Sequence, residues 1–277
     1  MYRFVLVGQQ GVGKSSIFSR LSPQSSPSLA LGSNQSVPIP PALFSVVTLD
    51  FPSTNFTSST SLDNLPQVLS TAHAILFIMS DPEDPNLNDL ISLLTKYNLN
   101  QKRYVFLHQV DKFDKESYPY LLEKAKQNAS RNGIDESHFF ETSLFDGSIN
   151  RTIPKIVTSL MLHYSELENY IAKLHKSCNA TCVIICDAAT YLPICNSMPN
   201  QPEQPTSIFE FILKVYPKGN KLTSVIFECN NSVVVFKPIN DKAGIFITSS
   251  ADGVTTDGIQ FNINHALPTL RKLISIE

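Results

Sequence analysis

Eight residues near the start of the chain have the types and spacing of a phosphate-binding loop. The stretch Gly8-Gln9-Gln10-Gly11-Val12-Gly13-Lys14-Ser15 fits the pattern G-x-x-x-x-G-K-[ST], between an apolar run and an amphipathic run. Its glycines let successive backbone N–H groups converge on a β-phosphate, Lys14 supplies a point charge, and the Ser15 hydroxyl can bind Mg²⁺. The predicted nucleotide contacts are Gly8, Gln10, Gly11, Val12, Gly13, Lys14, Ser15 and Ser16. The alternative is a glycine turn beside a surface lysine.

A second group of polar residues has the position of a purine-selecting site. Small GTPases read guanine N1 and N2 with the aspartate of an N-K-x-D motif at a strand end, and here His108-Gln109-Val110-Asp111 follows the strand-like run "YVFL". A lysine at the second position normally lies across the base and ties back to the phosphate loop. We therefore expect Gln109 to lower the affinity for nucleotide without changing the base that Asp111 selects. A surface loop that happens to contain an aspartate is the alternative.

Two further segments complete the predicted nucleotide site. Thr142-Ser143-Leu144 follows the next strand-like run, and a backbone N–H of Ser143 or Leu144 could meet guanine O6. Asp50 ends an earlier strand-like run and should hold Mg²⁺ through water. The region between Leu21 and Phe44 contains no threonine for the metal, and Ser33 or Ser36 could substitute weakly.

The residues that would position water for hydrolysis are altered. Ser53 stands where a glycine N–H normally contacts the γ-phosphate, and Thr54 stands where a glutamine normally orients water. Gln10 crowds the place of an inserted arginine finger. A finger and a glutamine together supply up to ~10⁵ in rate. We therefore expect nucleotide binding with slow hydrolysis, and no catalytic residue is assigned.

Alternating strand-like and helical runs must position these residues in the first half of the chain. The strand-like runs occupy residues 2–7, 44–49, 74–79, 104–107 and 138–141. Such alternation is typical of βαβ units and predicts an α/β domain with a mostly parallel, doubly wound sheet. Two segments rich in Ser, Pro, Gln and Thr, 22–41 and 52–64, flank the second run and have the positions of switch loops.

The second half predicts a separate α/β domain. A helical pattern over 153–176 breaks near Tyr164 and leads into a hairpin at 180–195, a helix at 207–216 and a second hairpin turning at Asn230-Asn231. A strand at 244–250 and a closing helix complete the order αββαβββα. The expected domains are 1–163 and 164–277.

Composition narrows the class of protein. The 277 residues are 42% hydrophobic and 17% charged, which suits a globular chain. A net charge of -2 gives no basic surface for nucleic acid or anionic lipid. No apolar segment is long enough for membrane insertion, no signal peptide is expected, and the predicted location is cytoplasmic. The five cysteines are expected to be buried free thiols: Cys178, Cys182, Cys186, Cys195 and Cys229.

Three motifs resemble those of Rag-type GTPases (Rag/Gtr family) of the C/D subtype. "DFPS" at Asp50, "HQVD" at His108 and "FFETSLFDGSI" from Phe139 are similar to the patterns D-F-P-G, H-K-V-D and T-S-[IL]-[YF]-D-x-S-I. The resemblance covers essentially the whole chain, because Rag proteins carry a roadblock-type domain of order αββαβββα after the P-loop small-GTPase domain. Ser53 and Gln109 depart from the pattern, so the chain is a divergent member.

The resemblance implies GTP or GDP with Mg²⁺ as ligands. It also implies an obligate heterodimer with an A/B-type Rag GTPase through the second domain, with the edge strands and the helix at 207–216 as the expected contact. In that family the pair docks on a scaffold at the lysosomal or vacuolar surface, and its nucleotide state reports amino-acid availability to the TOR kinase complex.

Three hypotheses follow from the sequence. The first is a guanine-nucleotide switch subunit, and the second is a pseudo-GTPase that forms a structural half of the heterodimer without cycling. Lys14 and Ser15 argue against an empty site, whereas Ser53, Thr54 and Gln109 argue against turnover. The third, a phosphate-loop kinase or ATPase, is disfavoured because Asp111 has the guanine-reading position. The sequence does not decide which nucleotide state is active or which regulators act.

Overall fold

The chain folds into two compact units. The computed structural model describes residues 1–21, 42–50, 65–198, 224–229, 232–250 and 255–275. One unit consists of Tyr2–Val37 and Phe44–Thr152, and the other of Met1, Pro38–Leu43 and Ile153–Glu277. The domain boundary expected at 163/164 stays a prediction. Ser33, Ser36, Ser53, Thr54, the helix expected at 207–216 and the turn at Asn230-Asn231 lie outside the described residues.

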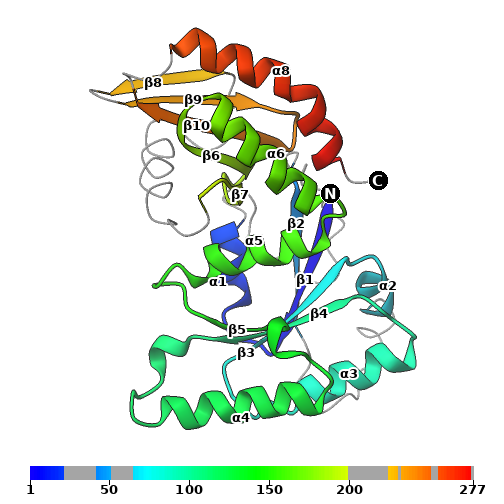
Figure 1. Ribbon diagram of the computed structural model, residues 1–277. Helices are drawn as coiled ribbons and strands as arrows, with labels where there is room; N and C mark the ends of the chain where they lie inside the picture. Colours follow the sequence, from blue (N-terminus) through cyan, green and yellow to red (C-terminus); the bar gives the residue numbers. More distant parts are fainter. Residues whose placement is uncertain (22–41, 51–64, 199–223, 230–231, 251–254, 276–277) are drawn as a thin grey trace. The chain divides into compact units, whose positions relative to one another are not determined.

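A five-stranded parallel sheet forms the centre of the first unit (Figure 1). Its strands are β1 (Tyr2–Gly8), β2 (Phe44–Asp50), β3 (Ala74–Met79), β4 (Lys102–His108) and β5 (Phe139–Thr142), in the order β2-β1-β3-β4-β5. These strands confirm all five runs expected from the sequence. Parallel strands covered on both faces are nearly continuously apolar, which is why these runs are recognisable.

Helices cover both faces of this sheet. They are α1 (Lys14–Leu21), α2 (Leu65–Ser70), α3 (Asn86–Lys96) and α4 (Tyr118–Arg131), with short 3-10 turns η1 (Val110–Lys112) and η2 (Glu136–His138). Helix α5 (Ser148–Leu160) begins in this unit and continues into the second unit from Ile153. Side chains of α2, α3 and α4 share one core with β1, β3 and β4, while α1 lies on the opposite face (Figure 1). The strand order reverses beside β1, and ligands of such sheets bind outside the carboxyl ends of the strands at that point.

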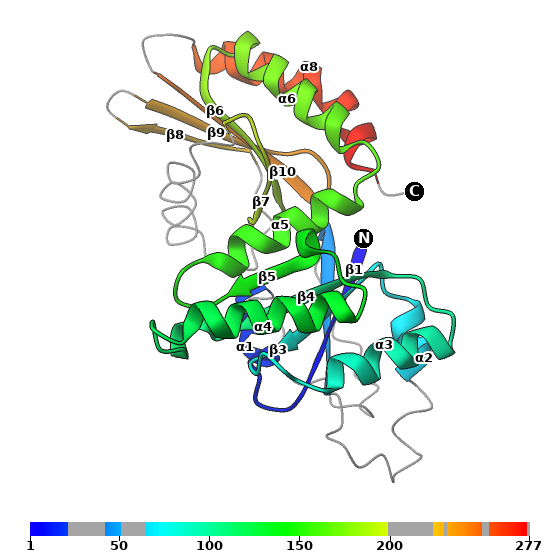
Figure 2. The ribbon, with the colours of Figure 1, turned by 60° about the horizontal axis from the view of Figure 1, so that its bottom comes forward.

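The second unit contains an antiparallel sheet with two described helices on one face. Its elements are α6 (Tyr164–Ser177), β6 (Ala180–Asp187), β7 (Pro193–Asn196), β8 (Val225–Cys229), β9 (Ser232–Pro238), β10 (Ala243–Ser250) and α8 (Thr256–Ile274), with the strand order β7-β6-β10-β9-β8. Helices α6 and α8 contact each other and the sheet (Figure 2). The described elements agree with the expected order αββαβββα, whose central helix lies outside the described residues.

The opposite face of this sheet carries its own apolar cluster. Cys182, Ile184 and Cys186 alternate along β6 and pack with Phe236 and Phe246 of neighbouring strands. The cysteines Cys178, Cys182, Cys186 and Cys195 are buried and free, which confirms the prediction for these four; the side chain of Cys229 lies outside the described residues. Within the described residues, no helix has the length and apolar character that crossing a membrane requires.

A buried carboxylate organises one end of β6. Asp187 Oδ1 accepts hydrogen bonds from the N–H groups of Ala189 and Thr190 at 3.1 and 2.8 Å, and Oδ2 accepts one at 2.6 Å from the N–H of Leu43, which belongs to the same unit. Burial raises the pKa of Asp187, and the N–H donors act in the opposite direction. The hydrogen bonds therefore offset the cost of burying the group.

Replacing Asp187 by asparagine should destabilise the second unit. The amide can keep its oxygen toward residues 189 and 190, but its NH₂ group then faces the N–H of Leu43, which is left without an acceptor. An unsatisfied buried donor costs about 1–3 kcal/mol. Urea unfolding followed by circular dichroism measures the difference, with the exposed Asp241→Asn as the control. Equal stability of the two variants would contradict this role of Asp187.

Candidate functional site

The phosphate loop joins β1 to α1 at the carboxyl edge of the parallel sheet. Helix α1 begins at Lys14, and the carbonyl of Gly13 accepts hydrogen bonds from the N–H groups of Ser16 and Ile17 at 3.1 and 3.0 Å. The first N–H groups of a helix have no partner inside the helix and favour an anion. Ser15 and Ser16 are exposed at this end. The loop therefore presents a helix start and a serine hydroxyl to solvent, as the sequence predicts.

Lys14 is folded into this loop. Its side chain is only 4% exposed, and Nζ donates a 2.8 Å hydrogen bond to the carbonyl of Gly8 and another to the carbonyl of Gln9. Lysine is rarely so buried without polar partners. The ammonium group of Lys14 is thus bonded to backbone carbonyl oxygens of its own loop. Phosphate oxygens of a bound nucleotide could replace these carbonyls as its hydrogen-bond acceptors.

Two glycines of the loop are required by close packing. At Gly13 (φ +97°), a Cβ atom would lie 2.6 Å from Cδ2 and 2.9 Å from Nε2 of His108. At Gly8, a Cβ atom would collide with the carbonyl of Ile78 on β3. The backbone therefore approaches β3 and the His108 side chain of β4 more closely than any other residue type permits.

His108 connects the predicted base-reading segment to the phosphate loop. The side chain has no solvent exposure, and Nδ1 lies 3.0 Å from Oγ1 of Thr142, its neighbour in the β4–β5 register. Nε2 is buried beside Gly13 and has no partner among the described residues. Nε2 is thus a buried polar atom without a described partner at the edge of the phosphate loop, and a polar ligand such as a nucleotide could satisfy it. Burial lowers the pKa of His108, although the carboxylates of Asp111 and Asp146 oppose the shift.

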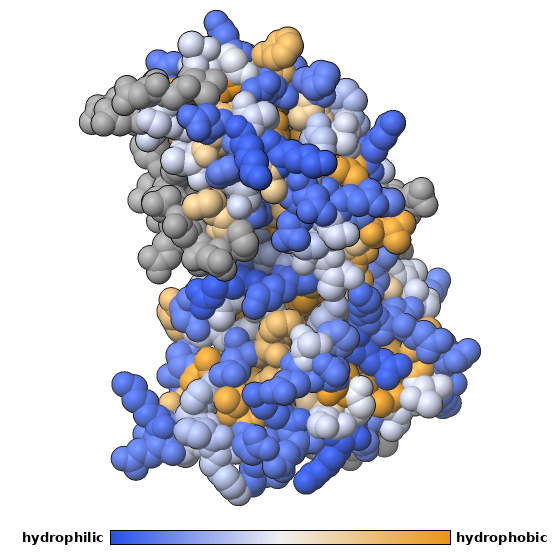
Figure 3. Space-filling view, viewed as in Figure 1, coloured by the Kyte–Doolittle hydropathy of each residue, from blue (hydrophilic) through white to orange (hydrophobic). Residues whose placement is uncertain are grey.

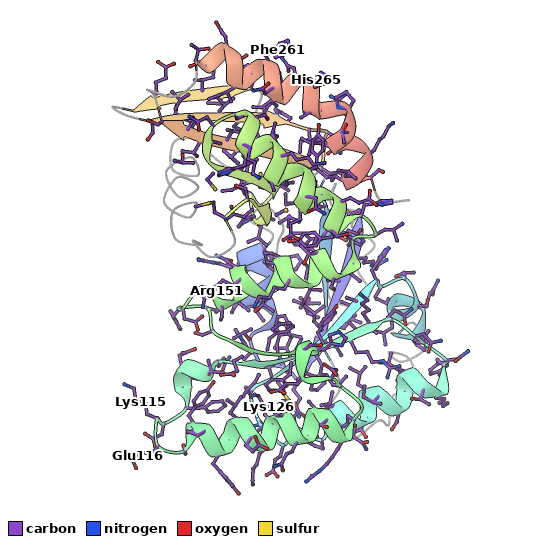
Figure 4. The ribbon with its side chains drawn as sticks, viewed as in Figure 1. Lys115, Glu116, Lys126, Arg151, Phe261 and His265 are labelled. Atoms are coloured by element: carbon purple, nitrogen blue, oxygen red, sulfur yellow. The ribbon has the colours of Figure 1, made fainter. Side chains whose placement is uncertain are left out.

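The lowered pKa of His108 predicts a loss of stability below pH 6.5. Between 6.5 and the lower folded-state pKa, the unfolded chain binds a proton that the folded chain does not, so the free energy of unfolding falls as the pH falls through this window. Urea midpoints at pH 7.5 and 5.5 measure the fall, which should be smaller in His108→Asn. The exposed His265→Asn (Figure 4) should keep the wild-type pH dependence. The same slope in both variants would contradict this assignment.

Gln109 contacts the phosphate loop although it replaces a lysine. Its backbone is left-handed (φ 65°), its Nε2 lies 3.5 Å from the carbonyl oxygen of Gly11, and its Oε1 accepts a 2.7 Å hydrogen bond from Nζ of Lys112. The tie to the loop that the lysine normally makes is therefore present in weaker form. Whether the grip on nucleotide is reduced stays a prediction.

Asp111 is held by the loop after β5. The hydroxyl of Ser143 donates to Oδ1 of Asp111, whose side chain is otherwise exposed, and the N–H of Ser143 donates to Oγ of Ser148 at 2.7 Å. Ser143 therefore orients the carboxylate with its hydroxyl, and its N–H is occupied within the protein. Leu144, the other residue expected near guanine O6, follows directly in the same loop.

The expected metal ligands are placed only in part. The β1–β2 register pairs Asp50 with Gly8, so the backbone brings it beside the phosphate loop, while its side chain lies outside the described residues. Among the described residues, no three His, Cys, Asp or Glu side chains form a group that could hold a metal ion. Mg²⁺ binding by Ser15 and Asp50 stays a prediction.

Sequence reasoning missed one acidic neighbour of the loop. Asp84 lies five residues after Met79, the end of β3, and is buried. Its Oδ1 lies 3.4 Å from Nε2 of Gln9 and accepts a 2.9 Å hydrogen bond from the N–H of Asn86. Burial raises the pKa of Asp84. The available signal was its position: β3 is the neighbour of β1 in the sheet, so the residues after β3 must lie near the phosphate loop.

These features define a class of protein. A glycine loop between β1 and α1, with polar residues after β4 and β5 at the same edge of the sheet, is the arrangement of a phosphate-loop nucleotide-binding domain of the small G-protein type. The Gtr1/RagA G protein conserved region matches residues 3–215, which is most of the chain. The chain therefore belongs to the Gtr1/RagA family of Rag-type GTP-binding proteins.

Individual relatives match over shorter stretches. GTP-binding protein GTR1 of Saccharomyces cerevisiae is 30% identical over 108 residues, which cover 38% of this chain and 35% of that protein. The SsGBP–GDP complex is similar over 60% of this chain and 51% of its own, with 16% identity and a TM-score of 0.41. Myxococcus xanthus MglB is similar over 40% of this chain and 95% of its own, with 14% identity and a TM-score of 0.33. At such TM-scores neither likeness decides the fold.

Proposed function

We propose that this protein is the guanine-nucleotide-binding switch subunit of a Rag-type heterodimer, with slow GTP hydrolysis. The observation that carries the proposal is the meeting of two loops. His108 packs under Gly13 and Gln109 reaches Gly11, so the segment ending in Asp111 adjoins the phosphate loop directly. A nucleoside diphosphate has its phosphates at one end and its base at the other. Lys14 of the phosphate loop suits the phosphates, and Asp111 of the loop after β4 suits the base.

Guanine is the base that this geometry supports. The carboxylate of Asp111 can only accept hydrogen bonds, and guanine presents two adjacent donors at N1 and N2, whereas adenine presents an acceptor at N1. Ser143 occupies one lone pair of Oδ1 and fixes the carboxylate plane. The proposed ligands are GTP and GDP, with Mg²⁺ on the Ser15 hydroxyl and on Asp50 through water.

The proposal of slow hydrolysis rests on residue types in the switch region, and the proposal of a heterodimer rests on the family. Ser53 and Thr54 replace the glycine and glutamine that usually position the γ-phosphate and water. The motifs from His108 to Asp111 and from Phe145 to Ile149 support the C/D subtype. The proposed partner is an A/B-type Rag GTPase bound through the roadblock-type domain, and the proposed location is the cytoplasmic side of lysosomes or vacuoles, reached through a scaffold. The proposed output is amino-acid signalling to the TOR kinase complex.

A pseudo-GTPase is the second candidate. The same Ser53 and Thr54 favour it, because a subunit with a permanent or absent nucleotide needs no water-positioning residues. In that case the protein would act as a structural half of the heterodimer.

The nucleotide carried by the purified full-length protein tests the proposal. Heat denaturation followed by ion-exchange chromatography should release GDP or GTP in near-equal amount to protein. Single-turnover incubation with GTP and Mg²⁺ should then show hydrolysis slower than that of an ordinary small GTPase under the same conditions. No bound guanine nucleotide and no binding of added GDP would favour the structural candidate, and bound ADP or ATP would contradict both.

A further inference from the structure

The turn after β3 carries two polar side chains that are almost completely buried. Hydrophilic residues cover much of the face shown in Figure 3, with hydrophobic ones scattered among them, as is usual for a protein surface. Asp84 and Asn86, by contrast, are 2% and 0% exposed. Burying a polar group is costly unless hydrogen bonds compensate it, so the partners of these two side chains must explain why they lie inside.

Oδ1 of Asp84 accepts hydrogen bonds from two different parts of the fold. Two donors belong to Asn86 at the start of α3, its N–H at 2.9 Å and its side-chain Nδ2 at 2.5 Å. Pro85, the N-cap residue of α3, makes no side-chain cap, so Asp84 supplies one. The third donor is Nε2 of Gln9 in the phosphate loop, at 3.4 Å. One carboxylate therefore joins the start of α3 to the phosphate loop.

Helix α4 fixes the turn that carries Asp84. Nδ2 of Asn128 on α4 lies 3.3 Å from the carbonyl oxygen of Pro82 and 3.4 Å from that of Asp84. Oδ1 of Asn128 in turn accepts a 3.2 Å hydrogen bond from Nδ2 of Asn132, the C-cap residue of the same helix. The turn is thus anchored on the side of α4. Of the two ends of the contact between Asp84 and Gln9, the phosphate loop is the one that can move.

Packing does not fix the tip of the phosphate loop. At Gly11 (φ +88°), a Cβ atom would meet no atom within 4 Å, and the neighbouring Gln10 is exposed. Gln9 begins this tip, and its backbone carbonyl accepts a hydrogen bond from Nζ of Lys14. A shift of Gln9 would therefore displace one of the oxygens that orient the ammonium group.

We propose that Asp84 is a positioning residue of the nucleotide site. It holds the side chain of Gln9 and thereby keeps the phosphate loop in the conformation that receives the phosphates. This inference rests on the proposed guanine-nucleotide function and adds to it a residue outside the phosphate loop and the base-reading segments. A loop that is ordered before the ligand arrives loses less entropy on binding. A single hydrogen bond of this kind accounts for about threefold to tenfold in affinity.

Dissociation of fluorescent GDP from full-length variants tests the inference. Gln9→Met removes the donor, and Asp84→Ala removes the acceptor, so each should release GDP about threefold to tenfold faster than the wild type. The double variant should be no faster than Asp84→Ala, because both changes remove the same contact. Asp84→Asn keeps an acceptor oxygen and should stay within about twofold of the wild type. Asp81→Ala is the matched control: Asp81 is exposed in the same turn, its Oδ1 accepts a 2.9 Å hydrogen bond from the N–H of Glu83, and its loss should not change release.

Amide hydrogen exchange of the nucleotide-free protein observes the loop itself. The N–H groups of residues 9–13 should exchange faster in Gln9→Met and Asp84→Ala than in the wild type and in Asp81→Ala. If Gln9→Met releases GDP and exchanges like the wild type, or if the two single effects add in the double variant, Asp84 only caps α3 and the inference is overturned. Slower release from Asp84→Ala would show that its charge mainly repels the phosphates, which also overturns the inference. A wild type that binds neither GDP nor GTP would defeat the proposed function, whereas the exchange comparison would still decide the role of Asp84.

Discussion

Asp111→Asn should change the base preference from guanine to xanthine. The asparagine oxygen can still accept from N1–H of the base and from the Ser143 hydroxyl, but its NH₂ group would face the guanine 2-amino group, donor against donor. Xanthine carries an oxygen at position 2, which the NH₂ group can donate to. Each unmatched buried polar group costs about 1–3 kcal/mol, so two opposed donors predict a loss of GDP affinity of about 100-fold, with a corresponding preference for XDP.

Competition of GDP and XDP for the full-length variant measures this reversal. Asp114→Asn is the control, because Asp114 is exposed in the same region and has no place in the proposed base site. It should keep the wild-type preference for GDP. If Asp111→Asn also prefers GDP by the wild-type factor, Asp111 does not read the base, and the hydrogen bond from Ser143 serves only to shape the loop.

The parallel sheet and its phosphate loop could be predicted because their signals are local. Five apolar runs recur at βαβ spacing, and a glycine loop between a strand and a helix specifies its own geometry. The residues of each run are adjacent in sequence, so no knowledge of distant contacts is needed. The same reasoning located the hairpins and the closing helix of the second unit, where alternation and turn residues are likewise local.

The contacts that complete the site depend on strand register, which the sequence does not display. His108 meets Thr142 because β4 and β5 pair at that register, and Gly13 must be glycine because the His108 ring lies beneath it. Asp84 reaches Gln9 because β3, and not β2 alone, borders β1. The Asp187–Leu43 hydrogen bond joins residues 144 apart. Such pairs follow from the assembled sheet, and local patterns cannot supply them.

Lys14→Met should abolish tight nucleotide binding while leaving the fold intact. Methionine keeps an unbranched stem of similar size in a position that is 4% exposed, but it removes the ammonium group that would bind phosphate oxygens. Hydrogen bonds to charged groups are worth about 1.5–3 kcal/mol each, so the loss of two predicts a fall in GDP affinity of roughly 100-fold or more.

Calorimetric titration with GDP measures the affinity, and circular dichroism checks the fold, since Nζ of Lys14 also bonds the carbonyls of Gly8 and Gln9. Lys115→Met is the matched control, because Lys115 lies on the outer loop before α4 (Figure 4) and should bind GDP like the wild type. A folded Lys14→Met protein with unchanged GDP affinity would place the phosphates elsewhere. Combined with Asp111→Asn, the result separates the two ends of the ligand: Lys14→Met should weaken GDP and XDP equally, because the phosphates are common to both, whereas Asp111→Asn should change only their ratio.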